Sequence, residues 1–281
     1  MISGKGFVQR IPFDTVPAVI AALCAVLQLG CKRETPPPRT DAQPTSVKET
    51  PATSAVALDR ETAGEQAMAH DPAHPPIDCP LRKQGIDPTH LKPFEEVEKY
   101  IAFLERPDRA VWQKPDEVVE ALALEGDETV DDLGAGSGYF AFRFAKALPQ
   151  GRVIAADVEP EMIRHLHHRA MSEAVTNLDA RLIQPDDPMV PGGVDLVFIC
   201  DVLHHVANRP AWLKKIVDAM PSGGRLALIE FKEGPLPQGP PPSMKIPRAQ
   251  LIALLTDAGL VLRKDHADLL PYQVFLEFGK P

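Results

Sequence analysis

The sequence has 281 residues, a formal net charge of −9 and a hydrophobic share of 44%. That length is enough for one sizeable α/β domain with additional sequence, and the hydrophobic share is typical of a globular protein with a core. An acidic chain does not attract nucleic-acid phosphates over a broad surface, so we expect no nucleic-acid partner. None of the cysteines forms the Cys-x-x-Cys pair of a zinc or redox site. They are Cys24, Cys31, Cys79 and Cys200.

The N-terminus has the pattern of a targeting segment. Lys5 and Arg10 precede an apolar run over residues 16–30, which is shorter than the roughly 20 residues that a membrane-crossing helix needs. The run ends in Leu29-Gly30-Cys31, which resembles a bacterial lipobox, where a lipid is attached to the cysteine. We therefore expect residues 1–31 to be a signal or lipoprotein-like segment that places the protein at the membrane of the cell envelope. The alternatives for the segment are an uncleaved anchor and a plain cleaved signal, and the alternative location of the protein is the cytoplasm.

The composition changes after this segment. Residues 32–78 are rich in proline, including the run at 36–38, and contain few large apolar side chains. Such a segment cannot offset its ordering entropy by burial, so we predict a disordered linker. We divide the remainder into an N-terminal helical lead-in over 79–127 and an α/β domain over 128–281.

Hydrophobic periodicity predicts strands that alternate with helices in the remainder. The predicted helices are 95–106, 115–124, 139–148, 160–171, 209–220 and 248–258. The predicted strands are 128–133, 152–156, 177–183, 194–200, 225–231, 260–264 and 272–278. Alternation of this kind favours a parallel sheet, and the last two strands have no helix between them. The predicted fold class is α/β, a seven-stranded, mainly parallel sheet with helices on both faces and an antiparallel last strand.

A glycine-rich turn is the sharpest functional signal. The sequence DLGAGSG at residues 132–138 follows a predicted strand and opens a predicted helix. Glycines suit a tight turn that a ligand approaches closely, and ligands of open α/β sheets bind at the carboxyl ends of the strands. The spacing G-x-G-x-G differs from the G-x-G-x-x-G of a dinucleotide site. Asp132, two residues before the first glycine, suits a ligand with a cationic amino group better than a pyrophosphate.

Acidic residues follow the next three strands at the same predicted edge. Asp157 ends the second strand, 19 residues after Gly138 (157 − 138). At this interval a carboxylate can accept hydrogen bonds from both hydroxyls of a ribose. The pair Asp186-Asp187 follows the third strand and could receive the exocyclic amine of adenine. Asp201 follows the fourth strand.

Two histidines come shortly after the fourth strand. His204 and His205 are candidate general bases, because histidine titrates near neutrality. The alternative is that one of them caps or packs after the strand. No histidine spacing typical of a metal site is present, so we predict no bound metal.

Four segments together carry a family resemblance: VDDLGAGSGYF, AADVEPEM, PDDPMVPGGVDLVFICDVLHHV and MPSGGRLALIEF. They resemble class I S-adenosylmethionine-dependent methyltransferases, which have a Rossmann-like fold. They look closest to the small-molecule group that includes the quinone-biosynthesis C-methyltransferases. The resemblance covers residues 106–278. The residues that it implies to be cofactor-binding are Asp132, Gly134, Ala135, Gly136, Gly138, Asp157, Val158, Asp186, Asp187 and Asp201.

The resemblance also implies roles for single residues, and the sequence departs from the family pattern at Asp131 and in the adenine-contact region, residues 184–188. Asp132 would reach the amino group of S-adenosylmethionine, and Asp201 would line the methyl-transfer pocket. Gln113 and Lys114 would help to close over the cofactor. Asp131 stands where the family has an apolar strand residue, which predicts that the first strand frays or that this acid is exposed.

The function that we expect is methyl transfer from S-adenosylmethionine to a small-molecule acceptor. The donor is activated by its positive sulfur, so the protein has mainly to align the reactants and exclude water. One alternative is an envelope-attached protein that binds an adenosyl ligand without catalysis. An NAD-dependent oxidoreductase is disfavoured by the glycine spacing. The sequence predicts neither the acceptor nor the oligomeric state.

Overall fold

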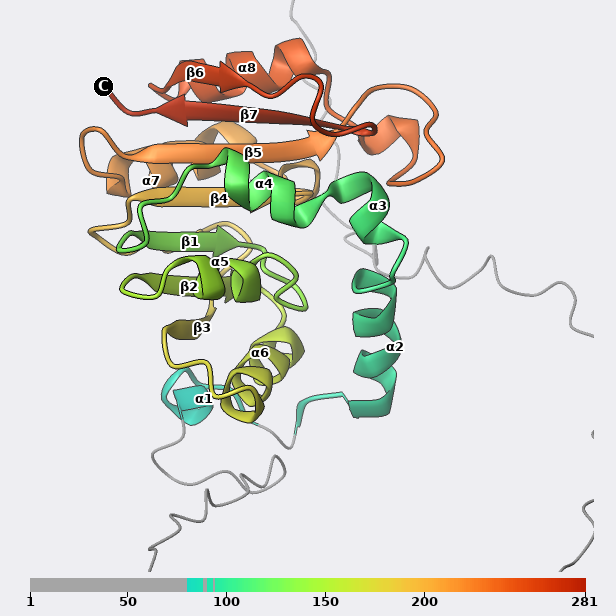
Figure 1. Ribbon diagram of the computed structural model, residues 1–281, viewed down its shortest axis with the longest axis vertical. Helices are drawn as coiled ribbons and strands as arrows, with labels where there is room; N and C mark the ends of the chain where they lie inside the picture. Colours follow the sequence, from blue (N-terminus) through green and yellow to red (C-terminus); the bar gives the residue numbers. More distant parts are fainter. Residues whose placement is uncertain (1–79, 88–89, 93) are drawn as a thin grey trace, which may run out of the picture. The chain divides into compact units, whose positions relative to one another are not determined.

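The structure is a computed structural model that describes residues 80–87, 90–92 and 94–281 (Figure 1). The predicted targeting segment and linker, residues 1–31 and 32–78, lie outside the described residues. Among the helices of the described part, none combines the length and the apolar character that crossing a membrane requires.

Seven strands form one sheet in the order β3-β2-β1-β4-β5-β7-β6. They are β1 (Thr129–Leu133), β2 (Arg152–Asp157), β3 (Leu178–Leu182), β4 (Leu196–Cys200), β5 (Arg225–Phe231), β6 (Val261–Asp265) and β7 (Gln273–Gly279). The first five strands pair in parallel, and β7 is antiparallel to both of its neighbours. The predicted fold class is therefore confirmed. The strand order reverses between β1 and β4, which is where ligands of open α/β sheets bind.

The helices follow the predicted pattern, with two additions. They are α1 (Pro80–Lys83), α2 (Phe94–Leu104), α3 (Arg109–Gln113), α4 (Pro115–Ala121), α5 (Ala141–Ala147), α6 (Pro160–Ser172), α7 (Arg209–Ala219) and α8 (Arg248–Asp257). The sequence predicted neither α1 nor α3. Both have five residues or fewer, so they are too short to show hydrophobic periodicity.

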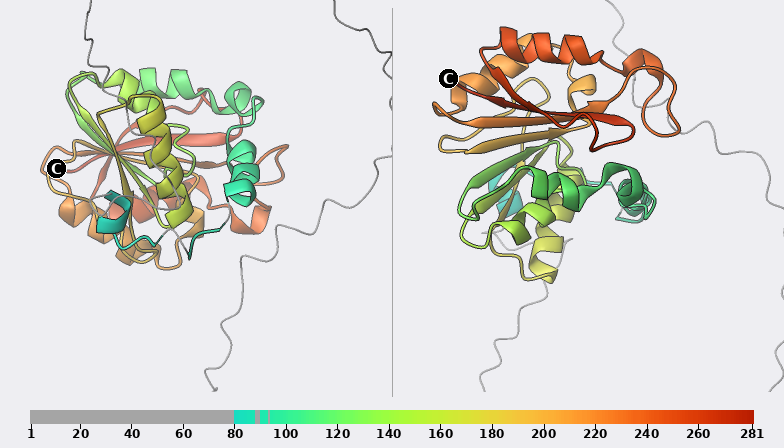
Figure 2. Two further views of the ribbon diagram at one scale, coloured as in Figure 1. Left: turned by 90° about the horizontal axis from the view of Figure 1, so that it is seen from below. Right: turned by 45° about the horizontal axis from the view of Figure 1, so that its top comes forward.

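Two hydrophobic cores lie on opposite faces of the sheet. Val130 and Ala155 point to the face that packs against α4, α5 and α6. Leu133 and Ile154 point to the face that packs against α7 and α8. Successive side chains of a strand alternate between faces, so β1 and β2 contribute to both cores. The left view of Figure 2 shows green and orange helices on opposite sides of the sheet.

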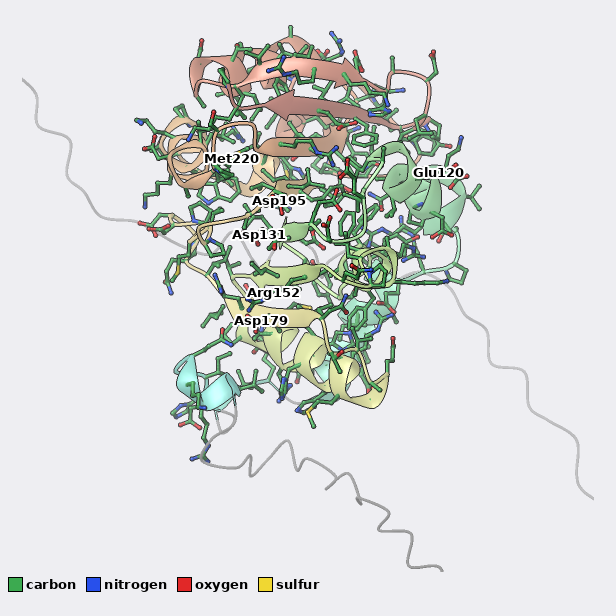
Figure 3. The ribbon with its side chains drawn as sticks, turned by 60° about the vertical axis from the view of Figure 1, so that its left-hand side comes forward. Glu120, Asp131, Arg152, Asp179, Asp195 and Met220 are labelled. Carbon is green, nitrogen blue, oxygen red and sulfur yellow. The ribbon has the colours of Figure 1, made fainter. Side chains whose placement is uncertain are left out.

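The expectation for Asp131 was wrong. Asp131 is only 1% exposed. It is paired with Ile154 of β2 on one side of β1 and with Val197 of β4 on the other. Figure 3 shows Asp131 on β1, between Arg152 at the start of β2 and Asp195 just before β4. Burial raises the pKa of the Asp131 carboxyl to about 7. The strand does not fray, because both of its edges are hydrogen-bonded to neighbouring strands.

The helices α2 and α3 stand at the carboxyl edge of the parallel strands. In Figure 1 they lie beside the ends toward which β1 and β5 point. Val97 and Ile101 of α2 pack against Met162 of α6. Arg169 of α6 makes an ion pair of 2.6 Å with Glu105, directly after α2. The lead-in is therefore attached to the α/β domain next to the glycine turn.

Candidate functional site

The glycine turn connects β1 to α5 at the carboxyl edge. Gly134, Gly136 and Gly138 have φ angles of 78°, 55° and 86°, which favour glycine. A Cβ atom on Gly134 would lie 2.3 Å from a methyl carbon of Val202, and one on Gly138 would lie 2.7 Å from Leu166. At Gly134 and Gly138, any larger residue would therefore clash with neighbouring side chains of the protein.

The third glycine has different surroundings. A Cβ atom on Gly136 would meet only Leu104, the last residue of α2, at an ordinary contact distance of 3.4 Å. The main chain of the turn is also tied to β2, because the N–H groups of Gly134 and Ala135 both donate to the carbonyl of Ala156, at 2.7 and 2.9 Å. The turn thus has a fixed shape, with α2 beside its middle glycine.

Asp157 is the last residue of β2, and its carboxylate is hydrogen-bonded to the main chain of the glycine turn. One of its carboxylate oxygens accepts a hydrogen bond from the N–H of Gly136 at 2.8 Å, and the other accepts one from the N–H of Glu159 at 2.9 Å. Burial raises the pKa of Asp157, although these two hydrogen bonds act in the opposite direction. The sequence predicted ribose contact for this residue, and its bond to the turn was not anticipated. Val158, the next residue, is 40% exposed at the same edge.

Asp132 is a buried carboxylate that lacks a full set of partners. It is 3% exposed, and its Oδ2 atom has no hydrogen-bond partner. Burial and the charges of Asp131 and Asp157 raise its pKa to about 8, while the positive charge of Arg109 lowers it. A cationic group of a ligand would favour the ionised carboxylate. The residue therefore fits the ammonium group for which the sequence predicted it.

Asp201 follows β4 in a left-handed conformation, with a φ of 59°. Both of its carboxylate oxygens lie 2.8 Å from the side-chain amide nitrogen of Gln273 on β7. The amide nitrogen of Gln113, on α3, donates to the same carboxylate at 3.1 Å. Burial and the charge of Glu230 raise the pKa of Asp201 to about 6. The resemblance had suggested Gln113, which is fully buried, whereas Gln273 was not anticipated.

The two candidate bases have different environments. The Nδ1 atom of His204 lies 2.8 Å from a carboxylate oxygen of Glu230, and its main-chain N–H donates to the other oxygen at 3.1 Å. Burial alone would lower the pKa of His204, but the hydrogen bond and charge of Glu230 raise it overall. His205 is exposed, and burial of part of its ring and the charge of His204 lower its pKa. Glu230 was missed, although a lone acid inside an apolar predicted strand is a readable signal.

The predicted adenine contacts lie on the loop after β3. Asp187 accepts the N–H of Met189 at 3.0 Å and makes an ion pair of 3.1 Å with Lys215 of α7. Those contacts lower its pKa. Asp186 is exposed. Asp187 is therefore already engaged by its own loop and by α7, and adenine contact stays a prediction for both residues.

Comparison with known proteins agrees with this geometry. Residues 132–226 match a family described as "Methyltransferase domain". This segment of the chain is therefore similar to a methyltransferase domain. The match begins at Asp132 and ends within β5, so it includes the glycine turn, Asp157 and Asp201. It excludes α2, and it also excludes α3 and β7, which supply Gln113 and Gln273.

Curated proteins that resemble the chain match only part of it. A ubiquinone/menaquinone biosynthesis C-methyltransferase from Dinoroseobacter shibae is 30% identical over 132 residues, which are 45% of this chain and 51% of that protein. An uncharacterized methyltransferase from Mycobacterium tuberculosis is 28% identical over 116 residues, 41% of this chain and 57% of that protein. The chain thus spans about half the length of these relatives.

A solved structure has a similar fold. A SAM-dependent methyltransferase from Aquifex aeolicus superposes with a TM-score of 0.61 at 22% sequence identity. The superposition covers 65% of this chain and 98% of that one.

Proposed function

We propose that this protein binds S-adenosylmethionine at the carboxyl edge of its sheet and transfers the methyl group to a small-molecule acceptor. The observation that carries the proposal is the incompletely partnered carboxylate of Asp132 beside a rigid glycine turn. A buried acid with a raised pKa is stabilised in its ionised form by a cation, and the cofactor carries both an ammonium and a sulfonium group. The family match over 132–226 supports the same assignment.

The residues at the carboxyl edge of the sheet would have separate roles in the reaction. The cofactor supplies a methyl group that its positive sulfur has already activated. Asp132 would bind the ammonium group, and Asp157 would orient the ribose from the end of β2. Helices α2 and α3 would limit access of water to the edge. His204, held by Glu230, is the candidate to accept a proton from the acceptor, because their hydrogen bond fixes the imidazole ring.

A binding experiment tests the first half of this proposal. Calorimetry with S-adenosylhomocysteine should show binding to the wild-type protein and a clear loss for Asp157→Ala, which removes both the ribose contact and the bond to the glycine turn. Asp179→Ala is the matched control, because this acid of β3 pairs with Arg152 away from the carboxyl edge. Absence of binding to the wild type would refute the proposal.

A turnover experiment separates catalysis from binding alone. The purified protein would be incubated with a methyl-labelled donor and fractionated small molecules from cells. Appearance of label in an acceptor fraction supports the methyltransferase. Binding without label in any fraction supports the alternative, an adenosyl-ligand-binding protein that lacks catalysis.

We further propose that the N-terminal segment attaches the protein to a membrane as a lipoprotein of the cell envelope. The support is the sequence pattern of residues 1–31, which ends in Cys31. Cell fractionation and mass spectrometry of the mature N-terminus test this. Cys31→Ala should abolish lipid attachment, whereas Cys24→Ala, inside the apolar run, should not. An intact N-terminus in a soluble fraction would instead favour a cytoplasmic protein.

A further inference from the structure

Arg109 places a positive charge among the carboxylates of the site. It belongs to α3, outside the family-matched segment, and no sequence motif singled it out. Its guanidinium carbon lies 4.0 Å from the ring centre of Tyr139, which follows the last glycine of the turn. Its charge acts on both Asp132 and Asp201. Arg109 is therefore located between the glycine turn and the end of β4.

The contacts of Arg109 hold it in place without neutralising it. Its Nη1 donates to the carbonyl of Leu104 at 2.6 Å, and its Nε donates to the side-chain oxygen of Gln113. Neither acceptor is a carboxylate, and no ion pair within the described residues involves Arg109. A guanidinium has five donor hydrogens, so several stay available for an anionic group.

The charge balance of the site indicates what that anionic group is. The methionine end of the cofactor is a zwitterion, and its carboxylate would enter an edge that already holds Asp132, Asp157 and Asp201. Like charges that lie close together in a buried setting repel each other. A carboxylate can bind there only if a cation compensates for it, and a guanidinium is suited to bidentate binding of carboxylates.

We propose that Arg109 binds the carboxylate of the methionine portion of the cofactor while Asp132 binds its ammonium group. This inference rests on the proposed function. Two different parts of the chain would then bind the two charged groups of the zwitterion. The ammonium group would be bound by β1 and the carboxylate by α3.

Two methyl donors that differ only in this carboxylate provide the test. S-adenosylmethionine and its decarboxylated analogue both keep the amine and the sulfonium. With the full-length protein, calorimetry should show that the wild type prefers S-adenosylmethionine. Arg109→Gln should weaken binding of S-adenosylmethionine on the order of 10- to 100-fold, as expected for a charge-assisted hydrogen bond, and leave the analogue nearly unchanged. Arg109→Lys, which keeps the charge, should retain part of the preference.

Two further variants serve as controls. Asp132→Asn should weaken both donors alike, because both keep the amine. Arg106→Gln, on the same segment, should affect neither, because Arg106 contacts Asp108 and Gln238. Thermal unfolding checks that each variant is folded.

The outcomes that overturn the inference are distinct from those that overturn the proposed function. Equal weakening of both donors by Arg109→Gln would mean that Arg109 only holds α3 in place. A wild type without preference for S-adenosylmethionine would also overturn the inference, even if no Arg109 variant could be purified. Failure of the wild type to bind either donor would instead overturn the proposed function.

Discussion

The two halves of the carboxyl edge are built in different ways. The half that we propose to bind the cofactor, here the cofactor half, is residues 132–158, one continuous β-turn-α-β segment that supplies the glycines and both Asp132 and Asp157. The other half, which we call the acceptor half because the proposed base His204 lies there, consists of Gln113, Asp201, Glu230 and Gln273, which come from four separate parts of the chain. Gln113 and Gln273 are 88 and 72 residues from the Asp201 that they contact. The first half is therefore specified by local spacing, and the second by the order of strands in the sheet.

The largest expected effect is on the cofactor half. Gly134→Ala places a Cβ atom against Val202 and demands a left-handed conformation. We expect the free energy of unfolding to fall by about 2–4 kcal/mol and S-adenosylhomocysteine binding to be lost. Chemical denaturation and calorimetry measure both. Gly192→Ala is the control, because a Cβ atom there meets nothing within 4 Å. Wild-type behaviour of the Gly134 variant would show that this half tolerates rearrangement.

A change in the acceptor half should leave cofactor binding intact. Glu230→Gln removes the charge that raises the pKa of His204, so this pKa should fall. Because a base acts in its neutral form, His204 would then become competent at lower pH than in the wild type. NMR titration of the ring protons measures the shift, and calorimetry should show unchanged S-adenosylhomocysteine affinity. Exposed Glu233 provides the control variant, Glu233→Gln. A parallel loss of cofactor affinity would mean that the halves are not separable.

Asp131, the buried acid beside Asp132, should affect the stability of the fold in a pH-dependent way. Its pKa is raised, so the folded state is favoured while the carboxyl is protonated and loses stability as the pH rises through about 7. Asp131→Val removes this loss and suits a strand between Ile154 and Val197. We expect stabilisation of about 1–3 kcal/mol near pH 8, shrinking toward pH 5. Thermal unfolding across this range would contradict the expectation if the gain did not depend on pH.

We expect the smallest effect from a change at the end of α2, beside the glycine turn. Glu105→Gln weakens the ion pair with Arg169 that attaches the end of α2 to α6. Both side chains are partly exposed, so we expect a stability loss of at most about 1 kcal/mol. Release of S-adenosylhomocysteine should become about 2- to 5-fold faster in stopped-flow measurements. Lys214→Gln, which breaks an exposed pair on α7, should not change the rate.

The sequence predicted the sheet well because strands and helices leave local periodic patterns. β5 was located at its observed bounds, and every other strand within two residues. The short helix α3 was missed, and with it the position of Arg109, because five residues carry no periodic signal. Burial of Asp131 was also missed, since the identity of a residue does not reveal that strands will pair on both of its sides.

By itself, the sequence determined the alternation of strands and helices, the glycine turn, and the acids that follow successive strands. These features depend on backbone conformation and on spacing within about twenty residues, which the chain encodes directly. Only the tertiary structure decided that Gln113 and Gln273 meet Asp201, that Glu230 holds His204, and that Arg109 lies near the glycine turn. Those contacts join distant segments, and the order of strands in the sheet, rather than any local pattern, brings them together.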